Sequence, residues 1–443
     1  MAVSRALRRA AVAGMGWMTC RICAILLAAG SLDADDGLRP LEILNGGIPR
    51  WMRFDGEYRA RFEDQENMLW RTANSDRYLL NRVRFGLTLR PGKWVTFYGQ
   101  AQDARVFFPR KLAHGPPLQD TLDLRQAWVQ LGGEDKFPLQ LRVGRQELIF
   151  GEERMVGASN WGNISRTFQA VKLTVRAERL GGLKLDTFAS TVVVPREGAW
   201  DGSLPGDNLH GAYAVFERLL GHGTVEPYFY WRLSPVAVKD TGSLGLRVTK
   251  FFGPRWYASS DTVLQRGTTG GRNVEAWAAY WRVRHTLSER RWKPTVTADV
   301  NMSSGDGDPS DGRFETFDVL YPTPHDKYGL ADQVGWKNIR HFGGIVEVTP
   351  RRSWSLQAKF HTWWLGSARD GLYAPGGALV LRDPLGASGR HVGEEIDVQF
   401  IWRPTKDMEA SGGAGHMWNG EFLKRMTPGR SYTFYYLSLT RKL

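Results

Sequence analysis

The sequence has little cysteine and no long apolar run, and each shortage excludes a class of protein. The two cysteines, Cys20 and Cys23, lie in an apolar N-terminal segment, and no second C-x-x-C follows them. We therefore expect neither a redox centre nor a zinc site. No segment approaches the roughly 18 uninterrupted apolar residues of a membrane-spanning helix. If the chain crosses a membrane, it must do so with the strands of a closed barrel.

Motifs for covalent catalysis are also missing. No G-x-S-x-G, H-E-x-x-H or Walker sequence occurs, and the nine histidines lack metal-ligand spacing. We therefore expect a protein that is not an enzyme. Two alternatives stay open. A membrane lipid hydrolase would need a Ser–His pair on a lipid-facing rim and would show activity in detergent. A soluble β-rich adhesin would be extracted by salt alone.

Residues 1–34 are typical of a secretory signal. Arg5, Arg8 and Arg9 give a basic start, an apolar stretch follows, and small residues precede a polar segment. The signal predicts that residues 35–443 form one mature domain in a Gram-negative envelope. A secreted chain rarely meets nucleic acid. The formal net charge of +13 therefore favours an anionic surface or an anionic substrate.

A two-residue period in hydrophobicity dominates the chain from residue 53 onward. In residues 53–64, Phe54, Tyr58 and Phe62 share one face of a strand, and Arg59 and Arg61 share the other. About eighteen such segments occur, each near the ~10 residues that a tilted strand needs to cross a bilayer. They are 53–64, 78–90, 93–106, 121–132, 138–149, 166–178, 182–194, 209–219, 223–233, 242–252, 255–266, 273–286, 293–304, 339–350, 353–366, 390–403, 406–414 and 430–441.

The connections between these segments alternate in length. The chain leaves the first segment through residues 65–77 and returns through Pro91 and Gly92, and later 305–338 is long where 351–352 is short. This alternation predicts an all-β fold, a transmembrane antiparallel β-barrel of about 18 strands, with short periplasmic turns and long extracellular loops. Mean hydropathy is only −0.37, as expected when every second residue faces lipid. The 18 tryptophans suit interfacial belts.

The opposite phase of the segments carries the charged side chains that would line a lumen. The residues that we expect there are Arg59, Arg61, Arg82, Arg84, Arg142, Arg282, Arg284, Lys359, Glu395 and Asp397. A basic wall with interleaved acids attracts a polyanion without trapping it, as transport requires. A structural role for any single arginine stays open, because buried charges usually pair with a neighbour.

Two motifs and the opening strand resemble the alginate export family of outer-membrane barrels. The first motif is RVGRQELIFGEERMVG, residues 142–157, continuing in WGNISRTFQAVKL, residues 161–173. The second is SSGDGDPSDGRFETFDVLYPTPHDKYGLADQVGWKNI, residues 303–339. The resemblance implies an eighteen-stranded pore with an electropositive constriction that passes an anionic uronate polysaccharide.

The resemblance also implies places for particular residues. It puts Arg142, Arg145 and Arg166 near the constriction, together with Arg82 and Arg84. It allows residues 107–120 to fold inward as an extracellular gate.

The sequence thus predicts a passive exporter of an anionic, alginate-like polysaccharide in the outer membrane. An uptake porin for small anions or oligosaccharides stays open. We expect outer-membrane lipid and periplasmic secretion-complex proteins as partners, a monomeric state, and no cofactor.

Calcium is an alternative at Asp306, Asp308 and Asp311, which have oxygen-ligand spacing in a Gly-rich loop. A solvated acidic turn is the other interpretation, since no Glu closes an EF-hand pattern.

Overall fold

The computed structural model describes residues 40–133 and 137–443. The predicted signal, with Cys20 and Cys23, lies outside the described residues. Among the described residues, no helix is both long enough and apolar enough to cross a membrane.

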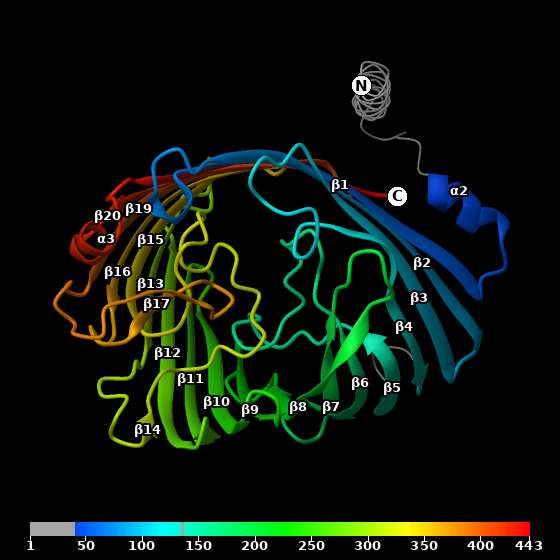
Figure 1. Ribbon diagram of the computed structural model, residues 1–443. Helices are drawn as coiled ribbons and strands as arrows, with labels where there is room; N and C mark the ends of the chain where they lie inside the picture. The colour runs from blue at the N-terminus through cyan, green and yellow to red at the C-terminus, as the bar shows by residue number, and fades with distance from the viewer. Residues whose placement is uncertain (1–39, 134–136) are drawn as a thin grey trace, which may run out of the picture.

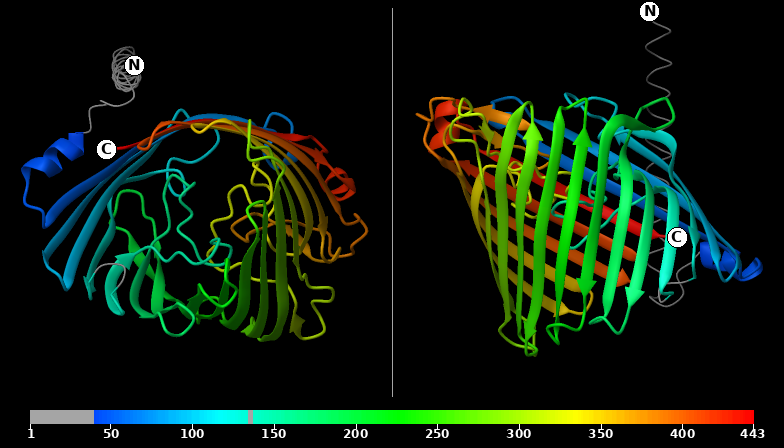
Figure 2. Two further views of the ribbon diagram at one scale, coloured as in Figure 1. Left: turned by 180° about the vertical axis from the view of Figure 1, so that it is seen from behind. Right: turned by 90° about the horizontal axis from the view of Figure 1, so that it is seen from below.

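Eighteen long strands form one closed antiparallel barrel (Figures 1 and 2). β21 (Tyr432–Lys442) returns to pair with β1 (Met52–Glu66), with Leu437 opposite Phe62, so that no edge is left unpaired. The other barrel strands are β2 (Asp76–Gly92), β3 (Val95–Phe107), β4 (Asp120–Leu131), β5 (Leu139–Gln146), β6 (Phe168–Ala177), β7 (Leu183–Val194), β8 (Gly202–Phe216), β9 (Gly223–Ser234), β10 (Lys239–Phe252), β11 (Trp256–Thr269), β12 (Arg272–Thr286), β13 (Thr295–Ser303), β15 (Ile339–Arg351), β16 (Trp354–Leu365), β19 (His391–Thr405) and β20 (Met408–Asn419). Each predicted segment overlaps one of these strands, which confirms the predicted fold.

Short helices and strands lie outside the eighteen barrel strands. They are the helices α2 (Pro40–Gly47) and α3 (Glu421–Met426), the 3-10 turn η1 (Met68–Trp70), and the strands β14 (Arg313–Phe314), β17 (Gly371–Tyr373) and β18 (Leu379–Arg382). α2 lies outside the ring near the C-terminus (Figure 1). The side-chain amide of Asn45 donates to the Phe54 carbonyl at 2.8 Å, which ties α2 to β1.

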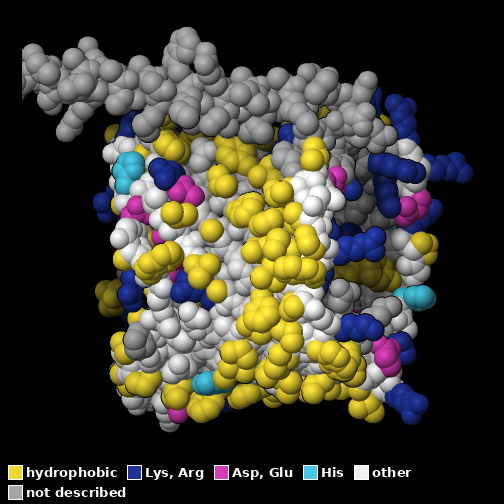
Figure 3. Space-filling model, turned by 90° about the vertical axis from the view of Figure 1, so that its right-hand side faces the viewer, with side chains coloured by type: hydrophobic (Ala, Val, Ile, Leu, Met, Phe, Trp, Pro, Cys, Tyr) yellow, Lys and Arg dark blue, Asp and Glu magenta, His cyan; other side chains and the backbone are white. Residues whose placement is uncertain are grey.

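The predicted side-chain phase is confirmed on the first two strands. Phe62 and Val83 are about 40% exposed (39% and 44%), whereas the neighbouring Arg61 and Arg82 are each 2% exposed. Alternate residues therefore face outward and inward, as the pleat requires. Hydrophobic side chains gather in a continuous patch on the outer face seen in Figure 3.

The connections sort by length onto two rims. We call the end with connections such as 93–94 and 406–407 the turn rim, and the end with residues 147–167, 304–338 and 366–390 the loop rim. Two connections on the loop rim, 235–238 and 270–271, are also short. The predicted alternation of short and long connections therefore holds for most of the chain. It fails from β9 to β12, where short turns join the strands on both rims.

The interior of the barrel contains two of the long loops. The β5–β6 loop (residues 147–167) and the β13–β15 loop (residues 304–338) lie inside the ring of strands (Figure 1). Their apolar residues form one core with inward aromatic side chains of the wall. Members of this core include Phe150, Met155, Val156, Phe168, Phe188, Tyr213, Tyr228, Tyr230, Phe317, Val319, Tyr321, Tyr328, Leu330, Trp336 and Trp363. The lumen is therefore partly filled by an aromatic core.

Candidate functional site

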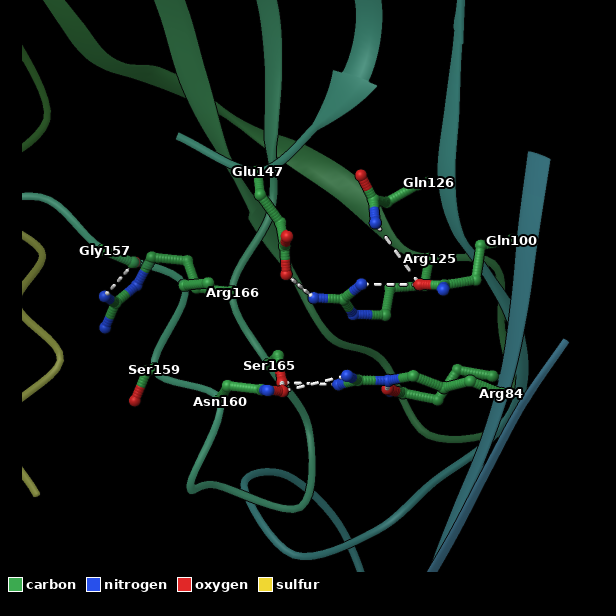
Figure 4. A network of polar contacts seen from close by, with 12 residues as sticks. Arg84, Gln100, Arg125, Gln126, Glu147, Gly157, Ser159, Asn160, Ser165 and Arg166 are labelled. Carbon is green, nitrogen blue, oxygen red and sulfur yellow. Dashed lines mark hydrogen bonds and ion pairs between the residues drawn. The ribbon is translucent and has the colours of Figure 1, made fainter. Parts of the chain in front are cut away.

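Buried arginines of β1 and β2 hold the tip of the β5–β6 loop. Arg59 donates to the carbonyls of Asn160 and Gly162 at 3.0 and 2.9 Å, and Arg82 donates to the same two carbonyls at 3.1 and 3.0 Å. Arg84 donates to Oδ1 of Asn160 at 2.9 Å and to Oγ of Ser165 (Figure 4). These predicted lumenal arginines do face inward, but they bind a loop as well as lining the lumen.

Two further arginines complete this group. Arg61 donates to the Trp161 carbonyl at 2.6 Å and lies over the Trp161 ring at 3.8 Å. Arg125 of β4 lies between Glu147 and Gln100 (Figure 4) and pairs with Glu147. The five guanidinium groups, here called the arginine cluster, are those of Arg59, Arg61, Arg82, Arg84 and Arg125. Three carboxylates form ion pairs with it, those of Glu57, Glu63 and Glu147. The cluster therefore keeps a positive excess.

Charged residues on the opposite wall hold the β13–β15 loop. The backbone N–H of Ala331 donates to Glu395 at 2.9 Å, and that of Leu330 donates to Asp397 at 3.0 Å. The Lys359 ammonium donates to the carboxylate of Asp326 in the same loop. The predicted inward positions of Lys359, Glu395 and Asp397 are thus found, and each contacts the loop.

The two inward loops contact each other. The rings of Trp161 and His325 stack with centroids 3.6 Å apart and planes 5° apart. Val156 forms a parallel bridge with Tyr321. Arg154 reaches from the β5–β6 loop to Tyr328, donating at 3.1 Å to its hydroxyl. The loops therefore form one body inside the barrel and narrow the lumen.

Aromatic stacking attaches this body to the wall. The ring of Phe150 stacks on Phe188 and Tyr213, each with centroids 5.2 Å away. Sequence reasoning missed this contact. The available signal was the run Leu148-Ile149-Phe150 at the start of a connection far longer than a turn, since apolar residues in a long loop need a surface to pack on.

Lys327 and Arg166, which belong to the two inward loops, form no ion pair with another described residue. Burial lowers the pKa of the Lys327 ammonium to about 8, and the nearby Arg154 also lowers it. Burial lowers the pKa of Arg166 to about 10. Arg166 donates only to carbonyls, those of Gly157 at 3.1 Å and Pro322 at 2.8 Å.

Arg142 and Arg145 do not join the arginine cluster. Arg142 faces inward near the turn rim, where its guanidinium lies 3.9 Å from the centroid of the Trp128 ring. Arg145 shares the phase of the exposed Val143, so it faces away from the lumen, and it donates to the Asp201 carbonyl at 2.7 Å. An odd spacing on a strand puts the two residues on opposite faces, and a place for them at the constriction stays a prediction.

The remaining expected lumenal arginines belong to the wall. Arg282 makes a two-point contact with Asp299, at 2.6 and 2.8 Å. Arg284 lies near the turn rim, with its guanidinium 5.0 Å from the centroid of the Tyr257 ring. Arg282 is therefore largely neutralised, and Arg284 lies apart from the two inward loops.

Residues 108–119, the β3–β4 loop, lie against the wall. The Asp76 carboxylate accepts the backbone N–H groups of Arg110, Lys111 and Leu112, at 2.8 to 2.9 Å. Leu112 also packs beside Leu80. The β5–β6 and β13–β15 loops reach the interior core, and a gating role for residues 107–120 stays a prediction.

The three aspartates considered for calcium have separate partners. Asp306 accepts Arg272 at 2.9 Å, Asp308 accepts Ser310 at 2.6 Å, and Asp311 accepts Arg313 at 3.0 Å. Among the described residues, the carboxylates close enough to share one ion lie elsewhere, in Asp120, Asp123 and Asp201. Calcium binding by the Gly-rich loop stays a prediction.

Comparison with known proteins assigns the chain. A family model described as alginate export matches residues 50–435. The chain belongs to the alginate export family. This membership confirms the resemblance seen in the two motifs. Together with the barrel, it makes the chain an outer-membrane β-barrel protein of the porin type.

Solved structures resemble this alginate export family member in fold. OccK3 (OpdO) of Pseudomonas aeruginosa has a TM-score of 0.60 and 12% identity, over 91% of this chain and 99% of that one. OccK11 (OpdR) of the same organism has a TM-score of 0.57 and 14% identity, over 90% and 97%. OccAB2 of Acinetobacter baumannii has a TM-score of 0.59 and 8% identity, over 88% and 98%. No curated protein matches the sequence.

Proposed function

We propose that this porin passes an anionic polysaccharide of the uronate type outward across the membrane. The observation that carries the proposal is the arginine cluster, in which five guanidinium groups meet three carboxylates beside the β5–β6 loop. A positive excess in a narrow lumen raises the local concentration of an anion. Family membership adds support for the substrate class.

The arrangement suits passage of a polyanion better than its tight binding. Guanidinium donors bind carboxylates strongly when they are free to make two-point contacts. In the arginine cluster, Arg59 and Arg82 already donate to loop carbonyls, as Arg61 does. The cluster therefore contributes a field without a strong site, and the field lowers the barrier to a chain of carboxylates.

Single-channel recording in planar bilayers tests the proposal. We expect an anion-selective reversal potential, and a current that polymannuronate blocks from the turn side. Neutral dextran of the same hydrodynamic size is the control and should block much less. Equal block by the two polymers would contradict export of a uronate polysaccharide.

A second candidate is an uptake porin for small anions or oligosaccharides. The stacking of Trp161 on His325 favours it, because joined loops inside the barrel leave a narrower path for a polymer. Liposome swelling separates the two candidates. A pore for small solutes admits monomeric uronates quickly and is insensitive to polymannuronate, whereas an exporter is blocked by the polymer.

A further inference from the structure

The outer face of the barrel carries an apolar groove of about 500 Å³. It crosses β15, β16, β19, β20 and β21. One row of paired residues runs along it, Val348, Leu356, Phe400, Gly412 and Leu437, each opposite the next in the strand register. These residues belong to the phase that faces away from the lumen. The groove therefore opens toward the lipid around the barrel.

Small residues create the groove. Ala358 and Ala414 lie in the neighbouring row, and Gly412 in the first, where larger side chains would continue the surface. Larger side chains project beside these small residues, since Leu437 is 65% exposed and Val398 is 54% exposed. A hollow that stayed empty in hydrocarbon would lose the dispersion contacts of its lining. Its occupant must therefore be hydrocarbon in character.

Tryptophans fix the depth of the groove relative to the membrane surface. The row next to it on the turn side contains Trp354 opposite Trp402, with ring centroids 5.8 Å apart. Tryptophan favours the boundary between hydrocarbon and headgroups. The groove thus begins directly beneath the headgroups of the turn-side leaflet.

Exposed cations stand at the headgroup end of the groove. Arg351 ends β15, Arg352 lies in the turn that follows it, and Lys406 lies in the turn between β19 and β20. None of the three forms an ion pair with another described residue, whereas the neighbouring Arg403 pairs with Glu409 at 2.7 Å. Positive charge at the surface and an apolar groove below it match the two parts of an anionic phospholipid.

We propose that this face binds one anionic phospholipid of the turn-side leaflet. Its acyl chain lies in the groove over Ala358, Gly412 and Ala414, and its phosphate contacts Arg351, Arg352 and Lys406. The proposal requires the outer-membrane location of the barrel and is independent of the polysaccharide. A lipid held there would support the wall behind Lys359 and Asp397, the strands that hold the β13–β15 loop.

Native mass spectrometry of the full-length barrel tests the site. The protein, stripped in detergent, is mixed with equal amounts of phosphatidylglycerol and phosphatidylcholine. We expect one phosphatidylglycerol per barrel in preference to phosphatidylcholine. The variant Ala358→Leu/Ala414→Leu fills the groove and should reduce retention of phosphatidylglycerol about tenfold. This ratio corresponds to the loss of about two buried methylene groups of the acyl chain. Ala189→Leu, an outward alanine on β7, is the control and should retain the lipid.

A charge variant tests the headgroup contact separately. Arg351→Gln/Arg352→Gln should remove the preference for phosphatidylglycerol, and Arg290→Gln/Arg291→Gln, in another turn of the same rim, should keep it. Heat-modifiable migration on a gel reports whether each variant folds. If Ala358→Leu/Ala414→Leu does not fold, the charge variant still tests whether the phospholipid binds. Equal retention of both lipids by the unaltered protein, or a dimer in place of a lipid adduct, would overturn the proposal. Neither result bears on block by polymannuronate.

Discussion

Trp161 of the β5–β6 loop stacks on His325 of the β13–β15 loop, with ring centroids 3.6 Å apart. The contact joins segments from opposite walls of the barrel. The guanidinium of Arg61 lies over the Trp161 ring, 3.8 Å from its centroid. The side chain that links the two loops therefore also contacts the arginine cluster.

Loss of this stack should loosen the loops. Trp161→Ala removes a ring contact of about 1 kcal/mol, so states with the loops apart should become about fivefold more frequent. We expect more frequent high-conductance events in single-channel recordings. Trp364→Ala, an outward tryptophan on β16 that is 40% exposed, is the matched control. An unchanged distribution of conductance in Trp161→Ala would show that the stack does not limit the pore.

Arg84 should have separable charge and anchoring roles. Arg84→Lys keeps the charge but cannot reproduce three directed contacts, to Gln102, Asn160 and Ser165. Each such charged hydrogen bond contributes about 1.5 kcal/mol or more. We expect Arg84→Lys to increase current noise while anion selectivity persists, and Arg84→Met to increase noise and reduce selectivity. Identical selectivity in all three proteins would mean that Arg84 acts only on the loop.

Anion selectivity should depend on pH through Lys327. A lysine is charged below its pKa, and burial lowers the pKa of Lys327 to about 8, so the lumen loses a positive charge as pH rises from 7 to 9. The ratio of anion to cation permeability should fall about fourfold, because one unit charge ~10 Å away in water attracts the anion and repels the cation by ~0.4 kcal/mol each. Reversal potentials at the two pH values measure this. Lys327→Arg should remain selective at both, since arginine stays protonated. A pH dependence that survives in Lys327→Arg would assign it to another group.

The aromatic contact at Phe150 should hold the β5–β6 loop in place. Phe150 is 6% exposed and stacks on Phe188 and Tyr213, so Phe150→Ala should destabilise the docked loop by about 3 kcal/mol or more. Limited proteolysis should then cleave residues 147–167 quickly. Ile149→Ala is the control, because the adjacent Ile149 is 49% exposed and contributes little to the interior. Equal cleavage of the two variants would contradict the docking role of Phe150.

The barrel wall could be predicted from the sequence because its cause is local. A strand between hydrocarbon and an interior alternates its side chains, so Phe62 and Arg61 reveal their faces by spacing alone. The inward positions of Arg59, Arg82 and Lys359 followed from the same rule. Arg145 shows the limit of motif transfer, since it lies three residues from Arg142 and faces the other way.

The sequence by itself determined the strand count and the alternation of inward and outward side chains along the wall. Tertiary structure alone decided that the β5–β6 and β13–β15 loops enter the barrel and that the arginines bind their carbonyls. The physical reason is that a loop has no period. Its path depends on contacts such as Trp161 with His325, which join residues 164 positions apart that nothing in their local sequence relates.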